Sequence, residues 1–233
     1  MSTSSLYLSH ILDNDTPTYG GEYPVSIKRS KDISEGAIAN ESEIHSTTHI
    51  GTHIDLPYHF YQEGQTIESY SADFWIFTSV LLIEISPEGE IIEQEIIEKI
   101  KEASAPQEIE ILLIKTGMEA WRKTQRYIME NPGFSPELYN YLIANFPKLR
   151  AFGFDTISLT SYNHPLIGRQ AHRSFLNPKQ PLLIIEDMSL HPISEETMIT
   201  QLVIAPLRIA SCDGMPCTVI ATIEEQTKRD MQT

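Results

Sequence analysis

The sequence predicts a mixed α/β fold with more strand than helix. Short runs rich in β-branched and other apolar residues recur along the chain, each of strand length and bounded by turn-forming residues. Between some of these runs lie segments in which apolar residues repeat with the spacing of an amphipathic helix. The 233 residues suffice for one domain with a sizeable core, and no repeat or low-complexity run divides them. We therefore expect a single domain over residues 1–233.

The first predicted elements are a buried strand and a surface helix. The segment "FWIFTSVLLIEI" (residues 74–85) is a β-branched and aromatic run that is too short to cross a membrane. A turn follows at Ser86, Pro87 and Gly89. The segment "EIIEQEIIEKIKEA" (residues 90–103) then predicts an amphipathic helix with an acidic outer face. Its apolar face consists of Ile91, Ile92, Ile96, Ile97 and Ile100.

The second half of the chain continues the alternation. Residues 108–117, "EIEILLIKTG", predict a strand that ends at Gly117. A helix is expected after Ser135, which is placed to cap it, with Pro136 in the first helical position. Further strands are expected within residues 149–159, 181–187 and 201–210. Pro206 in the last run indicates a sheet edge or a bulge, because proline cannot donate a ladder hydrogen bond.

Composition excludes several classes of function. Seventeen Lys and Arg against thirty-two Asp and Glu give a formal charge of −15, which repels nucleic-acid phosphates and anionic lipids. The start "MSTSSLYLSH" lacks the features of a signal peptide, and no apolar run is long enough to span a membrane. We therefore expect no nucleic-acid or membrane partner and a cytoplasmic location. Cys212 and Cys217 fit neither a zinc knuckle nor a redox pair, so both are expected to be reduced and structural.

The segment "HSTTHIGTHIDLPYHF" (residues 45–60) holds four of the eight histidines. Gly51, Pro57 and the β-branched residues oppose a helix, so an extended strand is predicted. Side chains alternate between the two faces of a strand. The polar or small residues then share one face, and the largely apolar ones face the core. The polar face carries His49, Gly51, His53, Asp55, Pro57 and His59, and the core face carries Ile50, Thr52, Ile54, Leu56, Tyr58 and Phe60.

This polar face predicts a metal site. Imidazole nitrogen and carboxylate oxygen are the ligands that zinc, manganese and iron accept. A turn or bulge at Gly51 would bring His49, His53 and Asp55 to a single ion. A lone histidine is more often a satisfied core or surface residue, but three histidines and an aspartate on one face favour ligation. His45 lies upstream in a polar run and is expected at the surface.

The string "HIGTHIDLPYHF" resembles the H-x-G-T-H-x-D-x-P-x-H signature of the metal-dependent cyclase-like hydrolases, the family of bacterial kynurenine formamidase and isatin hydrolase. Every fixed position matches. The resemblance extends over most of the chain. It includes "LSH" near the start, "TPTYGG" (16–21), "LLIKTG" (112–117), "GFDTIS" (153–158), "AHRSFL" (171–176), "IIEDMSL" (184–190) and "DGMP" (213–216).

The resemblance implies a fold, a ligand set and an acid/base residue. The fold is a β-barrel-like core with flanking helices, of the swivelling β/β/α type. One or two ions, zinc or manganese, are implied in each subunit, with Asp55 able to bridge two. His59 is implied as the catalytic acid/base. The implied metal ligands are His49, His53, Asp55, His172 and Glu186.

Two positions depart from the family pattern. The segment "NPKQP" (177–181) lengthens the loop between His172 and Glu186. Tyr19 stands where kynurenine formamidases have a tryptophan that lines the substrate pocket, and is therefore the expected substrate-binding residue. Tyr58 and Phe60 could also line a pocket, but their positions favour the core.

The favoured function is metal-dependent hydrolysis of a small amide. A bound divalent ion lowers the pKa of its water to near ~7 and polarises the scissile carbonyl. His59 can take a proton from that water and return it to the leaving amine. The most concrete substrate is an aryl formamide such as N-formylkynurenine, which would give kynurenine and formate. Isatin or another cyclic amide is the alternative within the class.

Two further classes remain open. One is a metal-containing protein that binds a small molecule without turnover, and the other is a metal-free scaffold with incidental histidines. A structural ion is usually closed by four protein ligands, often with cysteine, so the spare His59 favours an enzyme. A substrate carboxylate could be bound by Arg169, Arg173 or Lys115. The resemblance also implies a homo-oligomer, a dimer or a tetramer.

Overall fold

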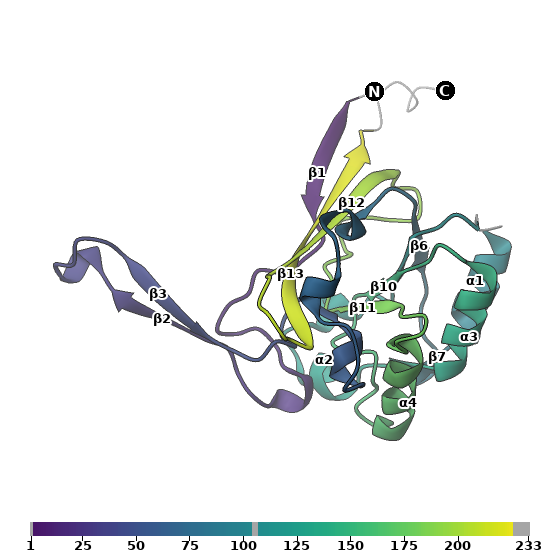
Figure 1. Ribbon diagram of the computed structural model, residues 1–233, viewed down its shortest axis with the longest axis horizontal. Helices are drawn as coiled ribbons and strands as arrows, with labels where there is room; N and C mark the ends of the chain where they lie inside the picture. Colours follow the sequence, from purple (N-terminus) through teal and green to yellow (C-terminus); the bar gives the residue numbers. More distant parts are fainter. Residues whose placement is uncertain (1, 104–106, 226–233) are drawn as a thin grey trace.

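The computed structural model describes residues 2–103 and 107–225, and most of its strands form one curved sheet (Figure 1). Within these residues the main sheet has nine strands, and two small two-stranded sheets lie outside it. The main strands are β1 (Thr3–Tyr7), β4 (His53–Asp55), β5 (Ile76–Phe77), β6 (Val80–Glu84), β8 (Ile111–Lys115), β10 (Ala151–Phe154), β11 (Leu183–Glu186), β12 (Ile199–Pro206) and β13 (Gly214–Glu224). The small sheets pair β2 (Ser26–Lys31) with β3 (Glu41–His45), and β7 (Ile91–Ile92) with β9 (Gly133–Phe134).

The main sheet curls into a nearly closed barrel. Its strand order is β5-β12-β13-β4-β11-β10-β8-β6, and β1 pairs with β13 beside this path. The two ends of the path, β5 and β6, are separated in sequence by only Thr78 and Ser79. Phe77 and Val80 are three residues apart and therefore at most about 10 Å apart, so the two edges of the sheet must come close together. This confirms the strand-rich mixed α/β fold with a barrel-like core.

Helices cover the parallel part of the sheet. Strands β6, β8, β10 and β11 are parallel neighbours, whereas β4 runs antiparallel to both β11 and β13. Parallel neighbours need long crossover connections, which here contain the helices. In Figure 1, α1, α3 and α4 lie together at the side of the sheet away from β1. The helices are α1 (Gln94–Glu102), α2 (Gln125–Met129), α3 (Pro136–Asn145) and α4 (Pro165–Phe175).

One large cluster of buried hydrophobic side chains joins the sheet to α1, α3 and α4, and a small second cluster contains Met118, Tyr127 and Ile157. The large cluster extends from Leu8 to Ala221 and includes Ile54 and Leu56 from the segment of the histidines. The main core therefore draws on elements from both ends of the described part of the chain. In the described residues no helix has both the length and the apolar character needed to cross a membrane.

Two predicted elements were wrong in extent. The predicted strand over residues 74–85 is two strands, β5 and β6, preceded by a 3-10 turn at Ala72–Trp75. The Glu110 carboxylate accepts hydrogen bonds from the backbone N–H groups of Thr78 (2.7 Å) and Ser79 (3.3 Å). These two residues therefore form the break between β5 and β6. The predicted helix over residues 90–103 begins only at Gln94, because the two preceding isoleucines form β7 and pair with β9.

Other predictions were confirmed. Helix α3 begins at Pro136, and the Ser135 hydroxyl accepts the N–H of Glu137 at 3.2 Å. Strands β8, β10 and β11 lie inside the predicted apolar runs. Pro206 is the last residue of β12, and β5 pairs with β12 only at Leu202 and Val203. At Pro206 this edge of β12 has no strand partner among the described residues, so no ladder hydrogen bond is lost through the absent N–H.

Candidate metal centre

Strand β4 lies at the centre of the candidate site. His53, Ile54 and Asp55 are buried between β11 and β13. The single strand predicted for the segment is reduced to these three residues, which alone form β4. Gly51 turns the chain before them with a φ of 58°, and Pro57–His59 forms a 3-10 turn after them. The turn at Gly51 occurs where the sequence predicted one, and His49 and His59 therefore reach the site from outside the strand.

Two imidazoles and two carboxylates meet in the buried part of the site. His53 Nε2 lies 3.4 Å from Asp55 Oδ1 and 3.5 Å from Glu186 Oε2. His172 Nε2, from α4, lies 3.5 Å from Asp55 Oδ2 and from Glu186 Oε1. Glu186 ends β11 directly opposite His53 in the strand register, so the sheet itself brings these two residues together. All four residues are buried.

The two buried histidines present the nitrogen that a metal needs. His53 Nδ1 lies 2.8 Å from the Gly51 carbonyl oxygen, and His172 Nδ1 lies 2.9 Å from that of Gly168. Each ring therefore donates its Nδ1–H to the backbone, which leaves Nε2 as the nitrogen that could bind an ion, as in metal-binding histidines. His53 Nε2 is buried and has no hydrogen-bond partner among the described residues. The spacing of about 3.4 Å between donor atoms matches neighbouring ligands on an ion with bonds of about 2.1 Å.

Glu186 is fixed by the loop after β10. Its Oε1 accepts the backbone N–H of Leu159 at 2.7 Å and the Ser158 hydroxyl at 3.3 Å. Oε2 is left facing His53. The longer loop over residues 177–181 therefore leaves Glu186 in the site.

His49 and His59 share a carboxylate that the sequence analysis did not single out. His49 lies 2.8 Å from Asp55 through Nδ1 and 2.9 Å from Asp213 Oδ2 through Nε2. His59 Nδ1 lies 3.0 Å from the same Asp213 oxygen. A Cβ on Gly214 would lie 2.5 Å from His49 Cε1, so only glycine leaves room for that ring. The one available signal for Asp213 was its place in the "DGMP" segment.

The electrostatics of the cluster favour a bound cation. Burial alone would raise the pKa of Asp55, but the histidines around it hold that pKa well below its usual range. Burial would likewise lower the pKa values of His49 and His172, but the neighbouring carboxylates raise both to about 10. Positive charge is thus stabilised at the point where Asp55, His172 and Glu186 converge. Ligand atoms of His49, His53 and Asp55 also lie within reach of one ion, as do those of Asp55, His172 and Glu186.

The cluster opens into a cavity of about 390 Å³ with aromatic walls. Tyr19, Tyr23 and Phe60 line it together with the histidines and carboxylates. Phe60 stacks on His172 with ring centroids 5.0 Å apart and lines the cavity, and its other side packs against the core that the strand pattern predicted for it. Burial and the charge of Glu186 raise the pKa of Tyr19 to about 12, which keeps its hydroxyl a donor. Tyr19 also packs on Tyr162.

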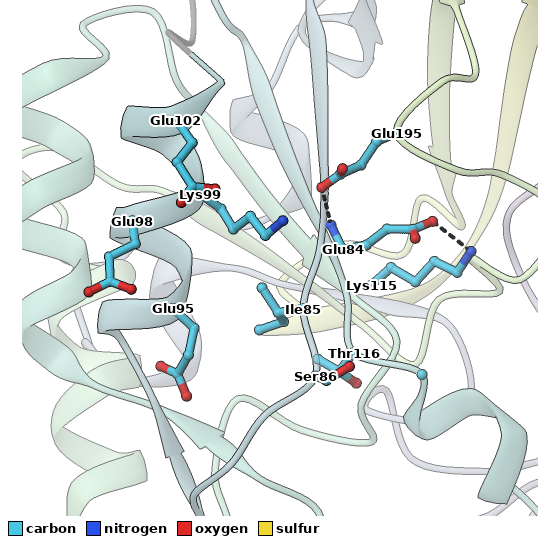
Figure 2. Close-up of a pocket in the computed structure, with 11 residues that line it drawn as sticks. Glu84, Ile85, Ser86, Glu95, Glu98, Lys99, Glu102, Lys115, Thr116 and Glu195 are labelled. Atoms are coloured by element: carbon cyan, nitrogen blue, oxygen red, sulfur yellow. Dashed lines mark hydrogen bonds and ion pairs between the residues drawn. The ribbon is translucent and has the colours of Figure 1, made fainter.

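Of the three basic residues proposed to bind a substrate carboxylate, two are engaged elsewhere. Figure 2 shows Lys115 beside Glu84 in a separate cavity, where its Nζ lies 2.9 Å from Glu84 Oε1. Arg173 lies over the ring of Tyr61. Arg169 is exposed on α4, and its positive charge acts on Tyr19, whose pKa it lowers against the larger effect of burial.

Cys212 and Cys217 are free thiols, and His45 is exposed.

Comparisons with known proteins agree with the fold. Kynurenine formamidase of Geobacillus thermodenitrificans (strain NG80-2) is 26% identical over 209 residues, covering 90% of this chain and 92% of the relative. "Cyclase-like protein 2" of Oryza sativa subsp. japonica is 24% identical over 223 residues, covering 92% and 78%. Isatin hydrolase A from Labrenzia aggregata, solved with benzyl benzoate, has a similar fold with a TM-score of 0.80. It shares 21% identity, and the match covers 96% of this chain and 94% of that one.

A family model named Cyclase, described as "Putative cyclase", matches residues 6–161. The matched region contains the histidine-rich segment, including β4 and the turns on both sides of it. Most of the chain is covered by this match, and the chain therefore belongs to the Cyclase family.

Proposed function

We propose that this protein is a metal-dependent hydrolase of small amides, and most concretely of an aryl formamide such as N-formylkynurenine. The observation that carries the proposal is the buried cluster of two imidazole Nε2 atoms and two carboxylates that lines an aromatic-walled cavity. An ion at that cluster is within reach of a flat amide held between the walls. The relatives named kynurenine formamidase support the choice of substrate class.

The residues that would hold the ion are His49, His53, Asp55, His172 and Glu186. Their nitrogen and oxygen donors suit zinc or manganese, one or two ions per subunit. When bound, such an ion supplies a Lewis acid and an acidified water. Backbone groups of Gly51, Gly168 and Leu159 orient His53, His172 and Glu186, which supports their proposed role as ligands.

His59 is the proposed acid/base. Its Nδ1 is held by Asp213, so Nε2 is the atom left to take a proton from the attacking water. The same nitrogen then returns the proton to the leaving amine, which an amide requires because the unprotonated amine is a poor leaving group. Phe60 meets the His59 ring edge to face at 4.7 Å and limits its orientation. Tyr19 closes the opposite part of the cavity and can donate its hydroxyl to the substrate.

We also propose a homo-oligomer. The β2–β3 hairpin projects far from the body of the molecule in Figure 1. It exposes the apolar side chains of Ile33, Ile38 and Ile44 on and beside its strands. An arm of this kind is stabilised when it packs on another subunit. Light scattering after size exclusion should give a dimer or a tetramer, and a monomer at micromolar concentration would contradict this.

The function is tested with protein prepared without an affinity tag. Elemental analysis should find zinc or manganese, and the protein should release formate from an aryl formamide until a chelator removes the ion. N-formylkynurenine, formanilide, isatin and simple lactams form the panel. Preference for isatin would move the substrate to the cyclic amides. Metal without turnover of any compound would favour a binding protein, and the absence of metal would favour a scaffold.

A further inference from the structure

Asp187, the residue after the proposed ligand Glu186, has an unusual backbone conformation. Its φ is 51°, in the left-handed region that residues other than glycine seldom adopt. Its backbone is held on both sides. The N–H donates to the Thr156 carbonyl at 2.9 Å, and the carbonyl accepts the Thr52 hydroxyl at 2.5 Å. The turn at Asp187 ends β11 where the Glu186 side chain enters the site.

The Asp187 carboxylate is bound in a buried polar cluster beside the site, and Asp187 is itself among the residues that line the cavity. Arg122 donates to it through Nε at 2.8 Å and through Nη2 at 2.6 Å, the paired geometry that gives the most directional ion pairs. The Tyr127 hydroxyl donates to the same carboxylate. Burial and Asp187 raise the pKa of Tyr127 well above its usual value, so this hydroxyl stays a donor. Asp187 and Tyr127 are buried, and the Arg122 side chain is 12% exposed.

This cluster links sequence motifs to which the proposed chemistry gives no role. Thr52 is the threonine of the H-x-G-T-H signature, and besides donating to Asp187 it accepts the backbone N–H of His10 at 2.9 Å. His10 belongs to the "LSH" segment. The carbonyl of Gly51, the residue before Thr52, receives Nδ1–H of His53. Thr52 therefore links the residue before the proposed ligand His53 to the residue after the proposed ligand Glu186.

We propose that Asp187 is a positioning residue for Glu186, and that its capture by Arg122 and Tyr127 sets the affinity for an ion held by Asp55, His172 and Glu186. The inference rests on the proposed metal site. With the carboxylate of Asp187 bound by Arg122 and Tyr127, the backbone turn is fixed, and Glu186 keeps the orientation in which Oε2 faces His53. Outer partners of ligating carboxylates of this kind typically change metal affinity by about 10–100-fold.

The test uses Asp187→Gly and Asp187→Asn, because glycine and asparagine both tolerate the left-handed backbone. Asp187→Gly removes every contact of the side chain, and Asp187→Asn keeps an acceptor for Tyr127 while losing the charge that pairs with Arg122. Chelator competition with Zn²⁺ or Mn²⁺ alone should show affinity about 10–100-fold weaker for Asp187→Gly and a smaller loss for Asp187→Asn. If two ions bind, only the one at Glu186 should be weakened.

Asp155→Asn is the matched control. Asp155 is equally buried at the end of β10, but its carboxylate binds Thr116 and Gly117 and touches none of the proposed ligands. This variant should lose stability and keep wild-type metal affinity. Thermal unfolding of the metal-free proteins separates general destabilisation from loss of positioning. Arg122→Lys, which keeps the charge but not the paired geometry, should also weaken binding.

Wild-type affinity in Asp187→Gly, or an equal loss in Asp155→Asn, would overturn the inference and leave the proposed function intact. Wild-type protein that binds metal but hydrolyses no amide would overturn the function and leave the inference standing if the variants behave as described. Wild-type protein that binds no divalent ion would overturn both.

Discussion

The substitution Gly168→Ala tests how tightly the fold places His172. Gly168 lies on α4, one turn before His172, and its carbonyl receives Nδ1–H of that ring. A Cβ at this position would lie 2.1 Å from Oγ1 and 2.4 Å from Cβ of Thr160. Because real contacts of this kind do not fall below 3.0 Å, helix and loop must separate by about 0.9 Å. Thr160 is buried, and its own Cβ is among the atoms in conflict, so a side-chain rotation does not relieve the overlap.

A shift of that size exceeds the tolerance of about 0.2 Å for a metal ligand. We expect metal affinity to fall and kcat/KM for an aryl formamide to drop by about 10²-fold, the usual cost of a misplacement near 1 Å. The free energy of unfolding should change less than the metal affinity and kcat/KM do. Overpacking costs about 1–3 kcal/mol, and the higher helix propensity of alanine offsets about 1 kcal/mol of this. Gly89→Ala, where the nearest atoms are 4.0 Å away, is the control. Unchanged metal affinity and kcat/KM in Gly168→Ala would refute the placement of His172 as a ligand.

The remaining predictions concern the ligands and the acid/base. Asp55→Ala should remove most of the metal and all measurable hydrolysis, which elemental analysis and an activity assay would measure. Ile54→Val on the core side should cost about 0.5–1.5 kcal/mol of stability in thermal unfolding and leave the metal in place. Glu186→Gln should lower metal stoichiometry or affinity, since the amide lacks the charge that balances a divalent ion, and an unaltered chelator titration would exclude it as a ligand. His59→Ala should keep metal and fold but lower kcat by roughly 10²–10⁴-fold, and loss of metal would make it a ligand instead. Neighbouring carboxylates raise the pKa of His172 to about 10 against the effect of burial, so metal binding near pH 7 must displace its proton. The apparent metal affinity should therefore fall about tenfold per pH unit on acidification for each proton displaced. Calorimetry of metal binding in two buffers would contradict this if it showed no proton release.

Local sequence was enough to find the centre of the candidate site. The alternation of His53 and Asp55 about an apolar Ile54 predicts a strand with one polar and one apolar face, and β4 has that form, with both faces buried. Gly51 predicted the turn, since glycine adopts a positive φ at little cost. The start of α3 was equally readable, because a capping serine followed by proline acts within one turn of helix.

Pairing between distant strands decided the rest. Asp213 contacts His49 from 164 positions away, because β13 runs beside β4 and places Gly214 opposite Asp55. Glu186 faces His53 through the pairing of β11 with β4, and without the family resemblance nothing near it in sequence distinguishes it from an ordinary strand end.

The same reason explains the elements that the sequence misjudged. Residues 74–85 have the composition of one strand, and the chain breaks there only because Glu110, from a distant segment, binds the backbone of Thr78 and Ser79. Periodicity records which side of an element is buried, since burial acts on each side chain separately. It does not record which strand lies alongside, and that neighbour determines the partners of Asp213, Glu186 and Asp187.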